Sequence, residues 1–208
     1  MEKINIVVYG DSNTYGYSPD GSRYEERYGT ILNKLLGDKY IVNEEGVIGR
    51  TTIYPDKREG KIAIDTIEDD LKKYNKIDLL IIMLGTNDYK QANARSLNEL
   101  EYGMNKLLLK IKEFNNISNT LILSPILLAK NIEGLDLDFD HYSYLLSTYA
   151  NNVYRSLAQK YNLLFLDAKE VAFAGSDGEH FTKESHISLG NNIYRYIREN
   201  NIFTLKTF

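Results

Sequence analysis

The sequence predicts an α/β fold, a three-layer sandwich in which a five-stranded parallel sheet has helices on both faces. Short apolar runs alternate with stretches of helical periodicity along the whole chain, and this alternation favours parallel strands joined by helical crossovers. One run, residues 79–84, is apolar throughout and predicts a central strand buried on both faces. No linker, internal repeat or low-complexity tract interrupts the pattern, so we expect residues 1–208 to form a single domain that ends in a short tail.

The first half of the chain carries three apolar runs and two helical stretches. Gly37 follows the first helical stretch and is expected to end it. A segment rich in glycine, threonine, proline and charge precedes the second helical stretch and is expected to be a loop. The expected elements, in chain order, are a strand at 4–9, a helix at 24–36, a strand at 40–43, a loop at 46–61, a helix at 62–74 and the central strand at 79–84.

The second half of the chain repeats the alternation. Ser96 is an expected N-cap, and Glu99 three residues later completes a capping box that marks the start of a helix. The loop before the longest helix is acidic. The expected elements are a helix at 96–114, a strand at 120–123, a loop at 126–141, a helix at 142–161, a strand at 163–166 and a helix at 185–200.

The composition excludes several classes of function. Hydrophobic residues make up 43% of the chain and charged residues 26%, and the net charge of −4 comes without the basic stripe that nucleic-acid binding needs. Cysteine is absent, which excludes disulfides, thiolate metal sites and cysteine nucleophiles. The start of the chain lacks a signal-peptide pattern, and no apolar stretch approaches the roughly 20 residues of a membrane span. We therefore expect a cytoplasmic protein with no nucleic-acid partner and no membrane span.

Residues 9–14, Tyr-Gly-Asp-Ser-Asn-Thr, follow the first strand and contain a candidate nucleophile. Gly10 permits a tight turn, after which Ser12 would stand at the carboxyl edge of the sheet. A helix N-terminus at this place would favour developing negative charge. A simple turn or helix cap would explain the same residues.

A serine nucleophile needs a base, and the chain contains three histidines. His180 is the candidate, because Asp177 could hold one ring nitrogen while the other faces the serine. A turn at the Asp-Gly pair is the structural alternative. His141, beside Asp140, is expected at the surface or in a helix cap. His186 is expected to start the last helix and to pack behind the site.

Acyl transfer also needs N–H donors aimed at the oxyanion that forms on the substrate. Three candidates follow strands: the backbone N–H of Ser12, the backbone N–H of Gly49 and the side-chain amide of Asn87. A turn at Asn87 and a flexible loop at Gly49 are the structural alternatives. Such a site needs no metal, and we expect no cofactor.

Four short blocks of the sequence together resemble the SGNH hydrolases, also called GDSL-like lipases and esterases. Their order, spacing and placement after strands match over nearly the whole chain. The stretches 45–52 and 81–88 look like the bacterial arylesterase and acyltransferase branch, which acts on small acyl esters. The four blocks are Gly10-Asp11-Ser12, the glycine at Gly49, Gly85-Thr86-Asn87-Asp88, and Asp177-x-x-His180.

The resemblance implies a flavodoxin-like SGNH hydrolase fold and a role for each matching residue. Ser12 would be the nucleophile, His180 the base and Asp177 the residue that orients the base. Gly49 and Asn87 would complete the oxyanion hole with the N–H of Ser12. The implied activity is a serine esterase that hydrolyses small acetyl-type esters through an acyl-enzyme. Relatives in this branch are often homo-oligomers.

Two departures from the family pattern concern the entrance to the site. Ile48 and Gly49 stand where relatives often carry pairs such as Ser-Ala, which would change the pocket shape but keep a backbone N–H. Tyr15 and Tyr17 stand where the branch tends to have tryptophans, which would make the entrance wider or more polar.

Asp11, Tyr15 and Arg50 are candidate substrate-binding residues. Arg50 could meet a substrate carboxylate, or it could fix its loop by pairing with an acid such as Glu45. Asp11 and Asp88 could instead be scaffolding that binds loop backbones. If these two carboxylates lay close together, they would suggest a glycosidase pair.

Other functions would use the same serine and histidine. Acyl transfer to an alcohol or a peroxide needs the same residues and differs only in the access of water. A lysophospholipase or thioesterase would need a long apolar channel as well. A non-catalytic binding module is the alternative from another class, and the presence of Ser12, Asp177, His180 and Asn87 argues against it.

Overall fold

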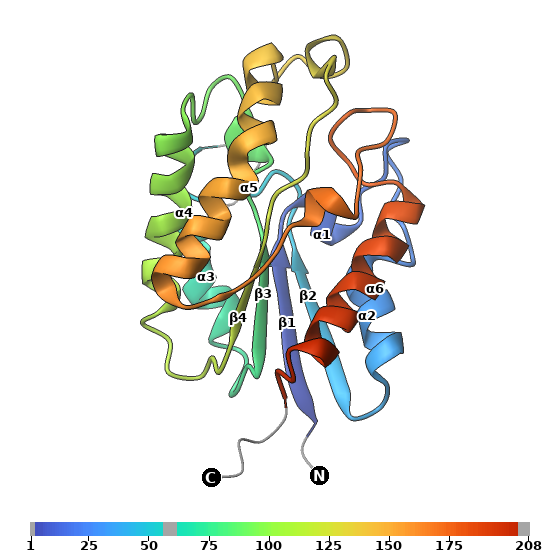
Figure 1. The fold of residues 1–208 in the computed structure, drawn as a ribbon, viewed down its shortest axis with the longest axis vertical. Coiled ribbons are helices and arrows are strands. Elements are labelled where there is room, and N and C mark those ends of the chain that lie inside the picture. The colour runs from blue at the N-terminus through green and yellow to red at the C-terminus, as the bar shows by residue number, and fades with distance from the viewer. Residues whose placement is uncertain (1–2, 56–61, 204–208) are drawn as a thin grey trace.

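Five parallel strands form one sheet within residues 3–55 and 62–203, which are the residues described by the computed structural model (Figure 1). The strand order is β2-β1-β3-β4-β5, the flavodoxin-like order, and it confirms the fold class that the sequence predicts. The strands are β1 (Ile4–Gly10), β2 (Tyr40–Gly46), β3 (Leu79–Met83), β4 (Thr120–Leu123) and β5 (Leu164–Leu166).

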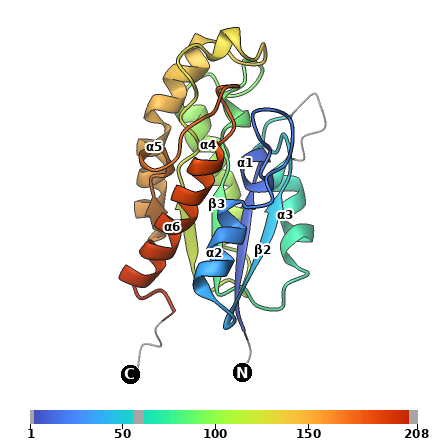
Figure 2. The same cartoon turned by 90° about the vertical axis from the view of Figure 1, so that its right-hand side faces the viewer.

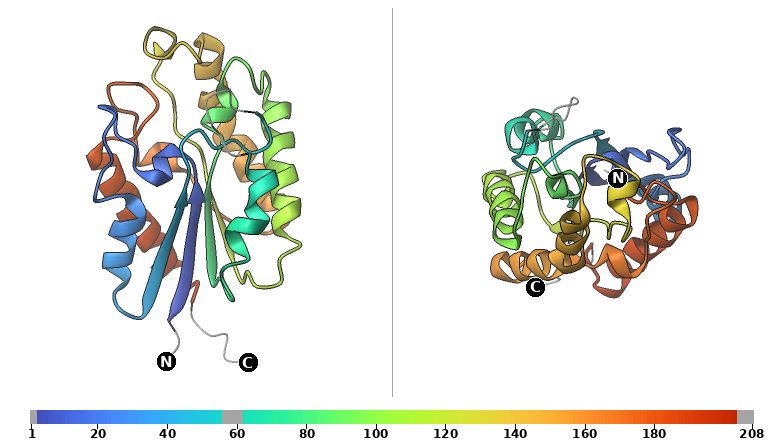
Figure 3. Two further views of the ribbon diagram at one scale, coloured as in Figure 1. Left: turned by 180° about the vertical axis from the view of Figure 1, so that it is seen from behind. Right: turned by 90° about the horizontal axis from the view of Figure 1, so that it is seen from above.

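Helices cover both faces of the sheet. Helices α2 and α6 pack side by side on one face, while α3, α4 and α5 cover the other (Figures 2 and 3). In the described part of the chain, none of the helices has the length and apolar character that a membrane crossing requires. The helices are α1 (Ser12–Tyr15), α2 (Tyr28–Leu36), α3 (Ala63–Leu71), α4 (Leu97–Ile111), α5 (His141–Tyr161) and α6 (Lys183–Glu199).

Three single-turn 3₁₀ helices also occur in the described residues: η1 (Asn87–Tyr89), η2 (Ile132–Gly134) and η3 (Ala168–Glu170). The sequence predicts no helix in these segments, because a single turn carries too few residues to show periodicity. The tail expected at the end of the chain, and residues 56–61 of the expected loop at 46–61, lie outside the described residues.

The start of α2 and the capping box of α4 differ from the prediction for local reasons. Helix α2 begins at Tyr28 and not at residue 24, since Arg27 is its extended N-cap and donates its backbone N–H to Thr30 Oγ1 at 2.7 Å. Ser96 caps α4 as predicted, accepting the Glu99 N–H at 3.2 Å. The Glu99 carboxylate, however, accepts the N–H of Arg95 at 2.7 Å, so the reciprocal bond of the capping box is displaced by one residue.

The second strand is longer than predicted because it lies at the edge of the sheet. The prediction ended at residue 43, where charged residues begin, but β2 continues through Glu44 and Glu45 to Gly46. Edge-strand side chains are only half-buried, and both carboxylates have a basic partner. Glu44 pairs with Arg27 at 2.5 Å, and Glu45 pairs with Lys73 at 2.8 Å.

The register of the sheet aligns the carboxyl ends of its first three strands. All five residues of β3 are fully buried, which makes it the central strand that its apolar run predicts. Gly10 at the end of β1 pairs with Gly46 of β2 on one side and with Met83 of β3 on the other. The segments that follow these strands therefore leave the sheet at one edge.

The chain turns tightly after β1. Asp11 is the N-cap of α1, and its carboxylate accepts the Asn13 N–H at 2.9 Å. Gly16 ends the short helix with φ of +86°, a conformation that disfavours other residues. Gly10 is required for another reason: a Cβ there would lie 2.6 Å from the Met83 carbonyl oxygen and still closer to Thr14 Oγ1.

We expect Gly10→Ala to reduce the free energy of unfolding by about 1–3 kcal/mol, because an added methyl group must displace β3 backbone or the start of α1. Urea denaturation measures this loss. Gly134→Ala is the matched control, since a Cβ at Gly134 has no neighbour within 4 Å. Equal stability of the two variants would contradict this account of the turn.

Candidate active site

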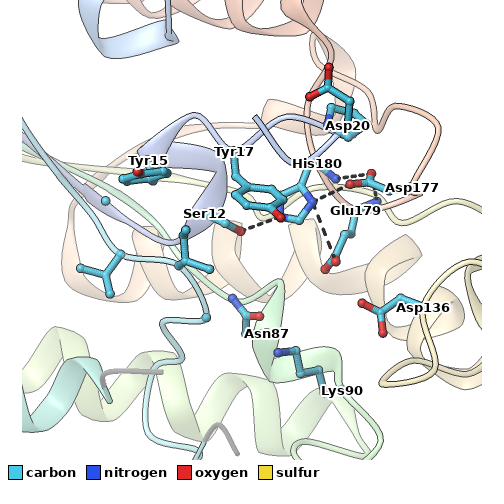
Figure 4. A pocket seen from close by; sticks show the side chains of 16 residues that line it. Ser12, Tyr15, Tyr17, Asp20, Asn87, Lys90, Asp136, Asp177, Glu179 and His180 are labelled. Carbon is cyan, nitrogen blue, oxygen red and sulfur yellow. Dashed lines mark hydrogen bonds and ion pairs between the residues drawn. The ribbon is translucent and has the colours of Figure 1, made fainter. Parts of the chain in front are cut away.

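A cavity of about 920 Å³ opens at the carboxyl edge of the sheet (Figure 4). The segments after β1, β2 and β3 contribute Ser12, Gly49 and Asn87 to its wall. The loop before α6 contributes Asp177 and His180. The structure thus brings together the five residues that the sequence analysis selected for chemistry.

Ser12, His180 and Asp177 form a continuous hydrogen-bonded chain. The imidazole Nε2 of His180 lies 2.9 Å from Ser12 Oγ, and its Nδ1 lies 2.7 Å from Asp177 Oδ2. Ser12 is the first residue of α1, so its side chain stands at a helix N-terminus, although α1 has only 4 residues. A base that contacts a hydroxyl on one side and a carboxylate on the other is the arrangement that activates a serine.

Asn13 holds the histidine loop against the serine, and the sequence analysis missed it. Its side-chain Nδ2 donates to the Glu179 carbonyl at 3.1 Å, and its Oδ1 accepts the Phe181 N–H at 2.8 Å. The two hydrogen bonds thus hold the backbone directly before and directly after His180. The only signal in the sequence is that Asn13 adjoins Ser12, and an asparagine at a helix start has an ordinary capping explanation.

The backbone of the histidine loop is ordered by Asp177. Its Oδ1 accepts the N–H groups of Glu179 at 3.1 Å and His180 at 3.0 Å, while its Oδ2 contacts the imidazole. Burial acts to raise the pKa of Asp177, but the hydrogen bonds from the His180 side chain and backbone outweigh it and leave the pKa below its ordinary value. Asp177 therefore remains ionised beside the ring.

His180 is a buried imidazole whose surroundings favour its protonated form. Burial alone would lower its pKa, but the hydrogen bond to Asp177 and the charges of Glu179, Asp177 and Asp11 raise it above its ordinary value. The ring of Tyr17 lies over it, with the two ring centres 4.7 Å apart. The neighbouring carboxylates therefore increase the basicity of His180, a residue that is suited to accept a proton.

Asn87 and Gly49 stand where the sequence analysis expected oxyanion donors. Asn87 Nδ2 donates to the Arg50 carbonyl at 3.1 Å, which uses one of the two N–H groups of the amide. Gly49 has φ of +78°, a backbone conformation that glycine adopts without strain. Both residues line the cavity together with Ser12.

Asp11 and Asp88 are buried scaffolding, which corrects the expectation that Asp11 binds substrate. Asp11 caps α1, as described above. Asp88 accepts the Thr52 N–H at 3.2 Å and also contacts the Thr52 hydroxyl. Burial raises the pKa of each carboxyl to about 6. Because both carboxylates bind protein groups behind the cavity wall, the site has no glycosidase pair at these two positions.

Arg50 is also buried behind the cavity wall, with 1% of its surface exposed, so its predicted contact with a substrate carboxylate is corrected. Its guanidinium donates to the carbonyls of Gly10 at 3.1 Å and Glu45 at 2.5 Å. It pairs with Asp70 at 2.9 Å and lies 4.0 Å from the centre of the Tyr9 ring. The alternative of an ion pair that fixes the loop therefore holds, but the carboxylate comes from Asp70 and not from Glu45.

Tyr15 and several unpredicted charged residues complete the wall. Tyr15 lines the cavity, and the Arg23 guanidinium lies 4.1 Å from the centre of its ring. A contact between Tyr15 and substrate remains a prediction. The charged lining residues that sequence analysis did not select are Asp20, Lys90, Asp136 and Glu179. Two of them had a signal in the sequence: Asp136 lies in the acidic loop at 126–141, and Glu179 directly precedes the candidate base.

The other two histidines lie where they were expected. His141 is exposed at the start of α5, where Asp140 is the N-cap. His186 is fully buried in the first turn of α6 and accepts the Tyr28 N–H on Nδ1 at 3.3 Å. The rings of Tyr28 and Phe181 pack against it. Burial lowers the pKa of His186 to about 4.

Comparison with known proteins matches one family over most of the chain. The family model described as GDSL-like lipase/acylhydrolase matches residues 8–186. A comparison with curated proteins gives no match.

Solved structures extend the comparison to 94–95% of the chain. The inhibitor-bound M. smegmatis aryl esterase is 28% identical with a TM-score of 0.83, over 94% of this chain and 99% of that chain. A carbohydrate acetylesterase from Sinorhizobium meliloti is 28% identical with a TM-score of 0.84, over 95% of this chain and all of that chain, 100%. A lipase/acylhydrolase from Enterococcus faecalis, 15% identical with a TM-score of 0.69 over 95% of this chain and 96% of that chain, shares the fold alone.

The buried His186 predicts an acid-sensitive contribution to stability. Its pKa is about 4 in the folded protein against an ordinary 6.5, so the unfolded chain binds the proton more readily between these values. The contribution is therefore complete above pH 6.5 and is lost as the pH falls toward 4, by up to about 3 kcal/mol. His186→Asn keeps an acceptor for Tyr28 but cannot be protonated. Urea denaturation at several pH values should show a shallower pH dependence for the variant, and equal dependence would contradict the assignment.

Proposed function

The chain belongs to the GDSL-like lipase/acylhydrolase family, and from this premise we propose that it is a serine esterase that hydrolyses small acetyl-type esters through an acyl-enzyme on Ser12. The family match and the esterase neighbours make it a carboxylic ester hydrolase. The observation that carries the proposed mechanism is the hydrogen-bonded chain from Ser12 through His180 to Asp177.

In the first half of the reaction, Ser12 Oγ attacks the ester carbonyl carbon and gives its proton to Nε2 of His180. Asp177 holds Nδ1 and stabilises the imidazolium that forms. The carbonyl oxygen takes up the negative charge of the tetrahedral intermediate. When the intermediate collapses, the bond to the alcohol oxygen breaks, and His180 returns the proton to that oxygen.

In the second half, water attacks the acyl-enzyme. His180 again accepts a proton on Nε2, now from the water, and a second tetrahedral intermediate forms. Its collapse breaks the bond to Ser12 Oγ, which recovers its proton from His180. The acid is released and the enzyme returns to its starting state.

The oxyanion would be held by three N–H donors from three separate segments. The Ser12 N–H lies at the start of α1, the Gly49 N–H lies in the loop after β2, and the Asn87 amide follows β3. The alignment of Gly10, Gly46 and Met83 at one edge of the sheet supports their convergence. Donors held in advance by the fold stabilise charge without reorganisation during the reaction.

The proposal of a small acyl group takes its support from the named relatives. One similar structure is an aryl esterase, and another is a carbohydrate acetylesterase. The two structures cover 94% and 95% of this chain, and their names point to different alcohol parts of the substrate. An acetyl group with a variable leaving group is the simplest class that includes both.

We expect Ser12→Ala to lower the hydrolysis of p-nitrophenyl acetate by about a thousandfold or more, because no other group would receive the acyl chain. The release of p-nitrophenol measures the rate. Ser156→Ala on the exposed surface of α5 is the matched control and should keep wild-type activity. Equal activity of Ser12→Ala and wild type would disprove the proposed mechanism.

We expect Asn87→Ala to lower kcat by about a hundredfold while KM changes little, since an oxyanion donor acts mainly in the transition state. Steady-state kinetics with the same ester separate the two constants. Asn191→Ala, an exposed asparagine on α6, controls for the loss of an amide. A rise in KM at unchanged kcat would instead assign Asn87 to ground-state binding.

A further inference from the structure

Glu179 places a second carboxylate beside the imidazole of His180. Its Oε1 lies 3.8 Å from Nδ1 of His180, the same nitrogen that Asp177 contacts at 2.7 Å. Figure 4 shows both acidic side chains converging on this side of the ring, while Ser12 lies on the other. At 3.8 Å the Glu179 carboxylate is too distant for a hydrogen bond, so it acts on the ring through its charge.

Two hydrogen bonds made by the backbone of Glu179 hold this residue in place. Its N–H donates to Asp177 Oδ1 at 3.1 Å, and its carbonyl accepts from Asn13 Nδ2 at 3.1 Å. The side chain is 14% exposed and lines the cavity. A largely buried charge so close to the ring is weakly screened by solvent.

Charged groups from several elements face Glu179 and His180. Burial raises the pKa of Glu179 to about 7, and the neighbouring Asp136 carboxyl adds to this shift. Glu179 therefore changes charge in the same pH range as a histidine. The other titratable groups are Asp177 in the same loop, Asp11 after β1, Asp20 before α2, Lys90 after η1, Asp136 before α5 and His186 in α6.

We propose that Glu179 is a positioning residue whose ionised carboxylate reinforces Asp177, so that two acids act on the proposed base. This inference rests on the proposed role of His180. During the attack the proton moves from Ser12 Oγ to His180 Nε2, and Glu179 neither gains nor loses one. Its negative charge stabilises the imidazolium formed in that step and raises the basicity of the ring.

The proposal predicts a distinctive pH profile. Wild-type kcat/KM should fall at acid pH through two ionisations, one of Glu179 and one of His180, which titrate as a coupled pair. In the Glu179→Gln variant only the ionisation of His180 should remain. Its midpoint should lie about one pH unit lower, because a neutral neighbour makes the ring less basic. The plateau of kcat should fall about threefold to tenfold with KM within about twofold.

Hydrolysis of p-nitrophenyl acetate from pH 5 to pH 9 measures these profiles. Glu184→Gln removes the same charge from an exposed position in the first turn of α6 and should reproduce the wild-type profile. In an Asp177→Asn background, Glu179 is the carboxylate nearest to Nδ1. Glu179→Gln should therefore reduce activity more in the Asp177→Asn background than in the wild-type protein.

A wild-type pH profile in folded Glu179→Gln would overturn the proposal. A rise in KM with an unchanged profile would also overturn it, by assigning Glu179 to substrate contact. If this variant fails to fold, Asp136→Asn provides the test, because it leaves Glu179 intact and should move the Glu179 ionisation to lower pH. An unmoved ionisation there would overturn the proposal. Retained activity in Ser12→Ala would instead refute the proposed function.

Discussion

The side-chain amide of Asn13 joins two distant parts of the chain at the proposed catalytic centre. It binds the backbone on both sides of His180, and it directly follows Ser12, which is 168 residues from His180 in sequence. The 2.9 Å distance between Ser12 Oγ and His180 Nε2 therefore depends on an asparagine that has no part in the proposed proton transfer. A hydroxyl and an imidazole held in this way need no rearrangement before the reaction.

A buried polar framework holds the segments that would carry the oxyanion donors. The Arg50 guanidinium binds the Gly10 carbonyl at the end of β1, and the Arg50 carbonyl accepts from the Asn87 amide. Asp88 binds the backbone of Thr52, two residues further along the same loop. These groups connect the three strand ends at which the proposed donors lie. Charged residues next to the proposed catalytic residues thus support the site from behind the cavity wall.

The sheet and the meeting of Ser12, Asn87 and His180 could be predicted, because apolar runs locate the strands and parallel strands end at one edge. The direction in which the loop side chains point could not be predicted from the sequence. The sequence leaves Arg50 open between a substrate contact and an ion pair with an acid such as Glu45. Its partner is Asp70 on α3, beyond the loop, and no local pattern identifies it. The bonds of Asn13 join segments far apart in sequence, so they become visible only once the turns are folded.

Covalent labelling tests the central claim most directly. The protein would be treated with a fluorophosphonate ester, which reacts with activated serines, and digested for peptide mapping by mass spectrometry. The account predicts one label per chain, located on Ser12, and a labelling rate that is largely lost in His180→Ala. A label on another residue, or an active enzyme that takes no label, would contradict the assignment of Ser12 as the nucleophile.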